Sequence, residues 1–159
     1  MNENPTNDAF EDPLENYEPK TYDDPLERAI AEESAKQIQH QPHTSIGPEM
    51  TVAAAVAKLA SDHVACLLVE EDGKLLGLFT NREVLNQVAL EKKMLDRPVR
   101  EVMTTDPVYV REDDPIAATL CVMALHGYRH VPILDADERV LGIASPQRVT
   151  SFLAKHLGT

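Results

Sequence analysis

Two stretches of the chain, residues 52–84 and 116–149, carry the same order of apolar and polar positions. Each begins with apolar residues at helical spacing, continues with two apolar runs around a short turn, and ends with a second helical pattern. The offset is 64 residues in the first helix, and one extra residue near Gly127 makes it 65 afterwards. The matched pairs are Val52 and Ile116, Val56 and Leu120, Leu59 and Met123, Val69 and Leu134, Asp72 and Asp137, Leu76 and Leu141, Gly77 and Gly142, Thr80 and Ser145, and Val84 and Val149. A unit of this size does not bury its apolar face alone, so the two copies are expected to pack together and to form two related clefts.

The first copy predicts a helix followed by two strands. Thr51 is the expected N-cap of the helix. The apolar run 65–69 predicts a strand that is buried on both faces, and residues 75–79 predict the return strand. Asp72-Gly73 between them is typical of a hairpin turn. The residues expected on the buried face of the helix are Val52, Val56 and Leu59.

A glycine and a second helix complete this copy. Gly77 lies inside the return strand, which indicates a close approach by another segment of backbone. A helix is expected from Asn81 to about Lys92. The residues expected to face inward from it are Val84, Leu85 and Val88.

The second copy follows a linker, residues 92–105, in which Pro98 suits the start of a short helical turn. A short strand is expected at 108–110, and the next helix carries Ile116, Leu120 and Met123 on one face. The remaining predicted elements are strands at 130–134 and 140–145 and a closing helix at 146–156.

The N-terminal part differs from the rest in charge. Residues 1–35 hold 11 acidic and 2 basic side chains, a balance of −9, whereas the other 124 residues have a balance of −3. Residues 1–23 are too polar to offset their ordering entropy and are expected to be a disordered acidic leader. Asp24, Pro25 and Glu27 suit the N-cap, N1 and N3 positions of a helix that continues to about residue 40. The two copies then occupy residues 41–97 and 98–159.

Composition excludes several partners. The chain has no basic patch for nucleic acid and no polybasic segment for an anionic membrane surface. It has no signal-peptide pattern, and no apolar run approaches the length of a membrane span. Cys66 and Cys121 lie in apolar patterns without metal-ligand spacing, so both are interpreted as small buried residues of a reducing, cytoplasmic compartment.

Five segments resemble the CBS domain, present here as a tandem pair, also called a Bateman module. Tyr109-Val110-Arg111-Glu112-Asp113-Asp114-Pro115-Ile116 is similar to the opening strand and helix entry of the family. Tyr128-Arg129-His130-Val131-Pro132-Ile133-Leu134 is similar to its basic, proline-containing strand. Its glycine-bearing strand is matched by Val140-Leu141-Gly142-Ile143-Ala144-Ser145 and by Leu75-Leu76-Gly77-Leu78-Phe79-Thr80-Asn81-Arg82-Glu83. Arg100-Glu101-Val102-Met103-Thr104 resembles the segment that commonly precedes a unit.

The resemblance implies an α+β fold in which two helix-strand-strand-helix units pack by pseudo-twofold symmetry. It also implies a homodimer and a regulatory binding module without an attached enzyme. In relatives that bind adenosine nucleotides, the ribose is held by a hydroxyl residue after the glycine strand and by an aspartate three positions later. A carboxylate can accept charge-assisted hydrogen bonds from two neighbouring hydroxyls.

The match to this ribose motif is partial in both copies. The first copy has Thr80 with Glu83, and the second has Ser145 with Arg148. Arg148 has no acceptor, so it would meet a phosphate or block the cleft. Thr80 and Glu83 also form a capping-box pattern, and Ser145-Pro146 is a common N-cap and N1 pair. Both interpretations of these residues stay open.

Three further basic residues are candidates for phosphate binding. Arg129 and His130 precede a strand where basic residues of nucleotide-binding relatives reach the phosphates, although such a pair can also be merely solvated. Arg82 is a further candidate, or else an exposed residue of a first helical turn. The first copy has no counterpart to Arg129 and His130, which favours one occupied site over two.

Neither a metal site nor a catalytic site is expected. His126 and His130 are four residues apart but belong to different predicted elements, and His40 and His43 lie in a predicted loop. No nucleophile–base pair, carboxylate pair or phosphate-binding loop is present in the sequence. The chain is therefore expected not to be an enzyme and to require no cofactor.

The favoured hypothesis is a cytoplasmic regulatory module that binds AMP, ADP or ATP between its two copies and signals to an unknown protein partner. Such signalling requires that the ligand bind one arrangement of the copies better than another. The alternative is a dimeric scaffold that binds no ligand and meets its partner through the acidic leader.

Overall fold

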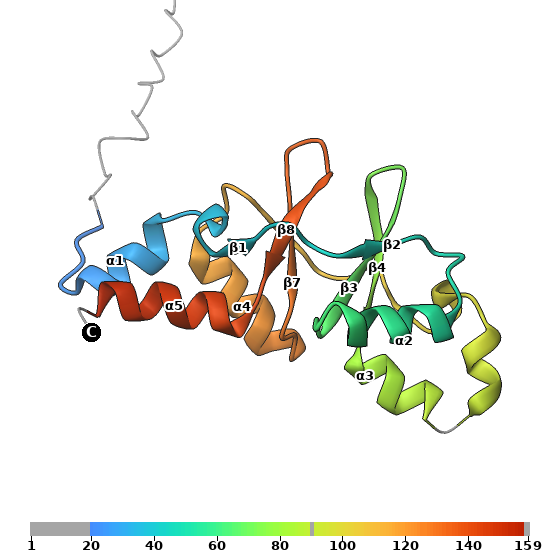
Figure 1. The fold of residues 1–159 in the computed structure, drawn as a ribbon. Helices are drawn as coiled ribbons and strands as arrows, with labels where there is room; N and C mark the ends of the chain where they lie inside the picture. The colour runs from blue at the N-terminus through green and yellow to red at the C-terminus, as the bar shows by residue number, and fades with distance from the viewer. Residues whose placement is uncertain (1–19, 90, 158–159) are drawn as a thin grey trace, which may run out of the picture.

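The computed structural model describes residues 20–89 and 91–157, and it has two four-stranded sheets with helices packed beside them (Figure 1). The predicted leader, residues 1–23, falls mostly outside this part. The strands are β1 Gln39–His40, β2 Ser45–Ile46, β3 Cys66–Glu71, β4 Lys74–Thr80, β5 Thr104–Thr105, β6 Val110–Arg111, β7 Val131–Leu134 and β8 Val140–Ala144. The helices are α1 Pro25–Glu32, α2 Val52–Ser61, α3 Asn81–Glu83, α4 Ile116–His126 and α5 Pro146–His156, with a π-helical turn η2 at Val84–Val88 and 3₁₀ turns η1 Ala35–Ile38, η3 Lys92–Asp96 and η4 Val99–Glu101. The predicted α+β fold with two repeats is confirmed.

The two repeats exchange their edge strands. The sheet orders are β2-β3-β4-β5 and β1-β8-β7-β6. Strand β1 precedes the first repeat but runs antiparallel to β8 of the second, whereas β5 precedes β6 but runs antiparallel to β4 of the first. The first sheet is therefore completed by a segment that the predicted boundaries place in the second repeat, and the second sheet by a segment that they place before the first repeat.

The backbone around η1 and η4 shows how far the repeat extends. The turn η1 docks on the second repeat in the same way as η4 docks on the first. The matched hydrogen bonds, all offset by 64 residues, are Ala35 N to Asp114 O and Val99 N to Met50 O (both 2.8 Å), Lys36 N to Glu112 O and Arg100 N to Pro48 O (both 3.1 Å), and Ile116 N to Glu33 O and Val52 N to Arg97 O (both 2.9 Å). The repeated unit therefore begins near residue 33.

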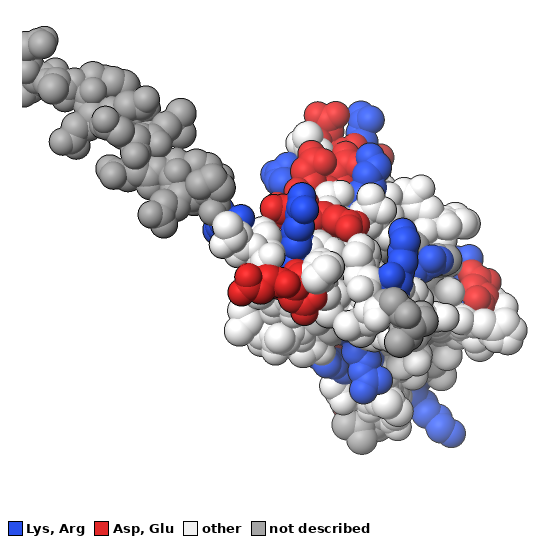
Figure 2. All heavy atoms as spheres, turned by 90° about the vertical axis from the view of Figure 1, so that its left-hand side faces the viewer, with Lys and Arg blue, Asp and Glu red and all other residues white. Residues whose placement is uncertain are grey.

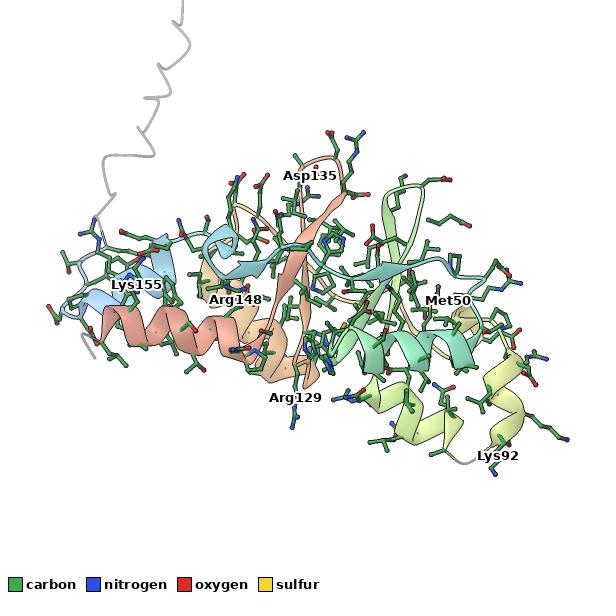
Figure 3. All side chains as sticks on the ribbon, viewed as in Figure 1. Met50, Lys92, Arg129, Asp135, Arg148 and Lys155 are labelled. Carbon is green, nitrogen blue, oxygen red and sulfur yellow. The ribbon has the colours of Figure 1, made fainter. Side chains whose placement is uncertain are left out.

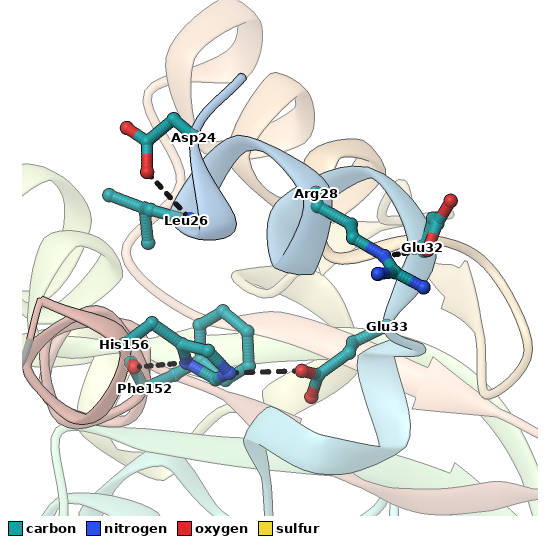
Figure 4. Close-up of polar contacts among 7 residues, drawn as sticks. All are labelled: Asp24, Leu26, Arg28, Glu32, Glu33, Phe152 and His156. Atoms are coloured by element: carbon teal, nitrogen blue, oxygen red, sulfur yellow. Dashed lines mark hydrogen bonds and ion pairs between the residues drawn. The ribbon is translucent and has the colours of Figure 1, made fainter. Parts of the chain in front are cut away.

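This docking ends α1 earlier than predicted. The helix stops at Glu32 instead of continuing to about residue 40, and Glu33 and Ser34 have extended backbones. Glu33 also reaches α5, because its Oε1 atom lies 3.0 Å from His156 Nε2 (Figure 4). Pairing with the second repeat thus replaces the last turns of a helix whose apolar stripe is weak.

The offset also changes at a different place from the one predicted. Ile46 pairs with Val69 in the first sheet, and Val110 pairs with Ile133 in the second, so Val69 is equivalent to Ile133 and not to Leu134. His63 and Gly127, 64 residues apart, both have positive φ after their helices. The extra residue therefore lies in the β7–β8 hairpin, and the prediction that placed it near Gly127 was wrong.

Three groups of buried side chains hold the fold together. One belongs to the first repeat, and one joins the second repeat to Ala29, Ala35 and Ile38 of the N-terminal segment. The third, at the seam between the sheets, contains Cys66, Leu68, Leu78 and Ile143. Strand β3 contributes to the first and the third groups, which confirms that it is buried on both faces.

Two residues predicted to be buried are exposed. Leu85 is 68% exposed, because adjacent helical residues are about 100° apart and Val84 and Val88 take the inward face. Cys121 is exposed on α4. That helix is apolar on nearly every face, so its sequence pattern does not reveal which face is covered. The strand predicted at 108–110 is also displaced, since β6 begins at Val110.

Candidate functional site

A cleft of about 380 Å³ lies at the seam between the repeats. Its first wall is the end of β4 and the start of α3, and its second wall is the stretch from the end of α4 to the start of β7. This first cleft brings together five of the seven candidate residues, Thr80, Arg82, Glu83, Arg129 and His130. The other two, Ser145 and Arg148, line a second cleft, which His130 also lines.

Glu83 lines the first cleft and is 6% exposed. Its Oε2 atom accepts hydrogen bonds from Thr80 N at 2.9 Å and Thr80 Oγ1 at 2.5 Å, which confirms the predicted capping box. Its Oε1 atom accepts a bond from Thr104 Oγ1 at 3.0 Å. A carboxylate offers about four lone pairs, so one remains for a ligand, and the ribose role of Glu83 stays a prediction.

Thr104 is a site residue that the sequence analysis missed. It lies in β5, the strand that the second repeat lends to the first sheet, and it lines the first cleft. Its position beside Glu83 depends on the strand exchange, which local patterns do not reveal. Its place in the segment Arg100–Thr104, already matched to the family, was the available signal.

Arg82 connects the two walls of the first cleft. Its Nη2 atom donates to Gly127 O at 2.9 Å, where the backbone turns left-handed after α4. The guanidinium group is exposed and has further N–H groups. Arg82 therefore joins the repeats at the edge of the cleft, and phosphate binding by it stays a prediction.

Arg129 and His130 supply the basic side of the first cleft. Arg129 is exposed at the lower end of β7 (Figure 3), whereas His130 is half-buried. Burial lowers the pKa of His130, and the positive charge of Arg129 lowers it further. The imidazole is therefore mainly neutral at pH 7 until an anion binds beside it.

The second cleft, of about 490 Å³, is lined by basic and neutral side chains and has no counterpart to the carboxylate of Glu83. Ser145 is the N-cap residue of α5, but its side chain makes no capping hydrogen bond. Arg148 takes the place that Glu83 has in the first repeat, and His43 and His63 also line the cleft. None of the lining residues is an aspartate or a glutamate.

The face of the molecule shown in Figure 2 carries side chains of both charges. On the side of the molecule that carries α1 and α5, basic side chains lie among acidic ones (Figure 2). In the described part of the chain, no helix combines the length and apolar character needed to cross a membrane. Nor do three or more His, Cys, Asp or Glu side chains gather there as a metal site would require.

The sequence matches the family model described as "CBS domain" twice, at residues 35–90 and 99–155. These matches begin at η1 and η4, where the reciprocal backbone hydrogen bonds begin. Relatives include a homoserine O-acetyltransferase of Methanosarcina acetivorans, 30% identical over 56% of this chain and 16% of that protein. An uncharacterised 17.7 kDa protein of Acidianus ambivalens is 29% identical over 63% of this chain and 60% of its own. The chain thus spans less than two thirds of both relatives.

Solved structures share the fold. The CBS domain protein NE2398 is 29% identical with a TM-score of 0.68, covering 76% of this chain and 96% of its own. CBSX2 in complex with AMP is 22% identical with a TM-score of 0.68, covering 77% and 97%. The CBS domain pair of MJ0100, in complex with 5′-methylthioadenosine and S-adenosyl-L-methionine, is 21% identical with a TM-score of 0.68, covering 77% and 96%.

Proposed function

The chain belongs to the CBS domain family, and on that premise we propose that it is a regulatory module that binds an adenosine nucleotide in its first cleft. AMP, ADP and ATP are the proposed ligands. Thr80 and Glu83 would meet the ribose, and Arg129 and His130, from the other repeat, would meet the phosphates. The observation that carries this proposal is that hydroxyl and carboxylate groups from one repeat face basic groups from the other across one cleft.

Because the first cleft lies between the repeats, nucleotide binding there would change the angle between them. A nucleotide that touches both walls binds best at one angle between the repeats, so binding favours that arrangement. The seam is held by a few apolar side chains, Cys66, Leu68, Leu78 and Ile143, and by the exchanged strands. Structures of this fold bound to AMP and to S-adenosyl-L-methionine support an adenosine ligand.

The rest of the proposal concerns assembly and location. We include a homodimer in the cytoplasm, without catalytic activity, whose partner reads the angle between the repeats. The homodimer rests on the resemblance to the family and not on a surface of the described residues. Light scattering during size-exclusion chromatography tests the dimer directly, and a monomer at micromolar concentration would contradict it.

The deciding experiment compares AMP with 2′,3′-dideoxy-AMP by calorimetry, in the native protein and in Glu83→Gln. Glutamine at N3 also completes a capping box, so this variant is expected to keep its fold. A charge-assisted hydrogen bond contributes about 1.5–3 kcal/mol, so AMP affinity is expected to fall about 10- to 100-fold. The dideoxy analogue has no hydroxyls for Glu83 to bind, so its affinity is expected to change little.

A matched control is Glu71→Gln, an exposed glutamate at the end of β3. It should leave both affinities unchanged. If Glu83→Gln weakens both ligands equally, or neither, Glu83 is only a helix cap and the ribose assignment is wrong. If AMP, ADP and ATP at millimolar concentration leave the native midpoint of thermal unfolding unchanged, the nucleotide proposal itself fails.

The alternative scaffold function draws support from Glu83, three of whose lone pairs are already used within the protein. Its test is removal of the leader. The deletion should end at residue 19, because Ala29, Ala35 and Ile38 belong to the core of the second repeat. Loss of partner binding with nucleotide binding intact would favour the leader as the interaction segment.

A further inference from the structure

The second cleft is built from three segments and differs from the first in its chemistry. Residues 42–44 before β2, residues 63–66 at the start of β3, and the N-terminal half of α5 with its N-cap Ser145 line it, together with His130 and Ile143. Arg148 lies on α5, away from Arg129, which precedes the start of β7 (Figure 3). The two clefts therefore hold separate sets of basic side chains and share His130.

The two repeats carry opposite charges at equivalent positions. In the first, Glu83 lies three residues after Thr80 and brings a carboxylate to the start of the helix. In the second, Arg148 lies three residues after Ser145, whose hydroxyl makes no cap bond. A ribose requires hydrogen-bond acceptors for its two hydroxyls. The charged acceptor of the first cleft is the Glu83 carboxylate, and its place in the second cleft is taken by Arg148, which can only donate.

The remaining lining of the second cleft adds no negative charge. Its titratable side chains are those of His43, His63, Cys66, His130 and Arg148. Burial raises the pKa of the Cys66 thiol to about 12, so this group is neutral at pH 7. Glu70, outside the lining, already pairs with His43, since Oε1 lies 3.0 Å from Nε2.

We propose that the second cleft is an oxyanion site, which takes a phosphate group through Arg148, Ser145 and His63 and does not hold a ribose. Arg148 supplies a permanent charge, and its planar guanidinium group matches phosphate geometry. Ser145 offers a hydroxyl that the helix does not use for capping. His63, which follows the C-cap of α2, also lines the cleft. The proposal stands independently of nucleotide binding in the first cleft.

The test is a ¹H–¹⁵N NMR titration of the full chain with sodium pyrophosphate, against sodium chloride at equal ionic strength. Saturable shifts are expected for the amides of Thr44, His63 and Gln147, which line only the second cleft. The amides of Asn81 and Asn86, which line only the first, report pyrophosphate that binds there instead. A second titration, with AMP, distinguishes a free oxyanion from the phosphate of a nucleotide as the ligand.

Two variants localise the binding. Arg148→Gln is expected to weaken pyrophosphate at least fivefold, whereas Arg139→Gln, at an exposed arginine of the β7–β8 hairpin, is expected to leave it unchanged. His63→Asn serves as the second variant, because asparagine tolerates the positive φ of this position. It is also expected to weaken binding.

Several results would overturn the proposal. Shifts that follow ionic strength without saturating would show screening only, and shifts confined to Asn81 and Asn86 would place the anion in the first cleft. Equal affinities in Arg148→Gln, His63→Asn and the native protein would remove the assigned ligands. None of these results bears on the Glu83→Gln comparison, so the two proposals fail separately.

Discussion

Strands β4 and β5 approach each other closely at Gly77, so the substitution Gly77→Ala, which adds one methyl group, tests whether β5 docks on β4. A Cβ atom at Gly77 would lie 2.6 Å from Met103 Sδ and 2.7 Å from Thr104 O. The thioether can move, but the carbonyl belongs to a strand paired with β4, where Gly77 is opposite Thr105. Gly77→Ala therefore has to displace β5, the strand that the second repeat lends to the first sheet.

The magnitude follows from two opposing effects. Overpacking by one methyl group costs roughly 1–3 kcal/mol, whereas replacing glycine by alanine stabilises by about 0.4–1 kcal/mol through the unfolded chain. We expect Gly77→Ala to lose about 1–2 kcal/mol in the free energy of unfolding, since the entropy gain offsets part of the overpacking. The midpoint of thermal unfolding should fall by roughly 2–8 °C at this chain length.

Urea unfolding followed by circular dichroism measures this loss, and Gly47→Ala is the matched control. A Cβ atom at Gly47 would have no atom within 4 Å beyond its own chain neighbours, so this variant should be neutral or about 0.4–1 kcal/mol more stable. A double-mutant cycle with Met103→Ala separates the two obstacles. Equal stability of the two glycine variants would mean that β5 does not lie on β4, and full recovery by Met103→Ala would mean that the carbonyl is no obstacle.

Three further predictions test burial and protonation. Ellman's reagent should modify exposed Cys121 in the native protein and spare Cys66, whose thiol pKa is raised to about 12 by burial; reaction of both thiols before unfolding would contradict this. Ile38→Ala should lower the free energy of unfolding in urea by about 2–4 kcal/mol, because the side chain is fully buried in the second repeat; a loss below about 1 kcal/mol would mean that the segment is not docked. Burial lowers the pKa of His130, so the unfolded chain binds this proton more readily; its contribution to stability is present above about pH 6.5 and lost as the pH falls below it. The thermal midpoint of His130→Gln should accordingly decline less between pH 7 and pH 5, and an unchanged slope would refute the assignment.

Local signals allowed much of the fold to be predicted from the sequence. The closing helix was expected at 146–156 and is observed at Pro146–His156, since a serine and a proline mark its start. Asp72-Gly73 and Gly77 also behave as predicted, because positive φ and close backbone approach favour glycine at these places. The helix start and the hairpin turn depend on residues that are neighbours in the sequence, whereas Gly77 indicates a close approach without revealing that β5 makes it.

The features that were missed depend on pairing between segments that are not neighbours in the sequence, β1 with β8 and β5 with β4. No local pattern shows that β1 and β5 change sheets, and this exchange is what brings Thr104 to Glu83. One signal was available, because Ala35-Lys36-Gln37-Ile38 matches Val99-Arg100-Glu101-Val102 in apolar and polar order at the offset of 64. Extending the repeat to these residues would have ended the first predicted helix before residue 35.

The two clefts differ in their lining residues, but one polar side chain lines both. Ala65 and His130 line both clefts, and of these two only His130 can donate or accept a hydrogen bond through its side chain. The backbone pairing makes Cys66 the counterpart of His130, so the imidazole occurs once and not twice. On the two proposals above, a nucleotide phosphate and a second oxyanion would both approach this one imidazole, each from its own cleft. Two anions bound on either side of this imidazole repel each other, so each ligand should weaken the binding of the other by the same factor. On these proposals the asymmetry between Glu83 and Arg148 would decide which ligand enters which cleft, and His130 would make each cleft sensitive to the occupant of the other.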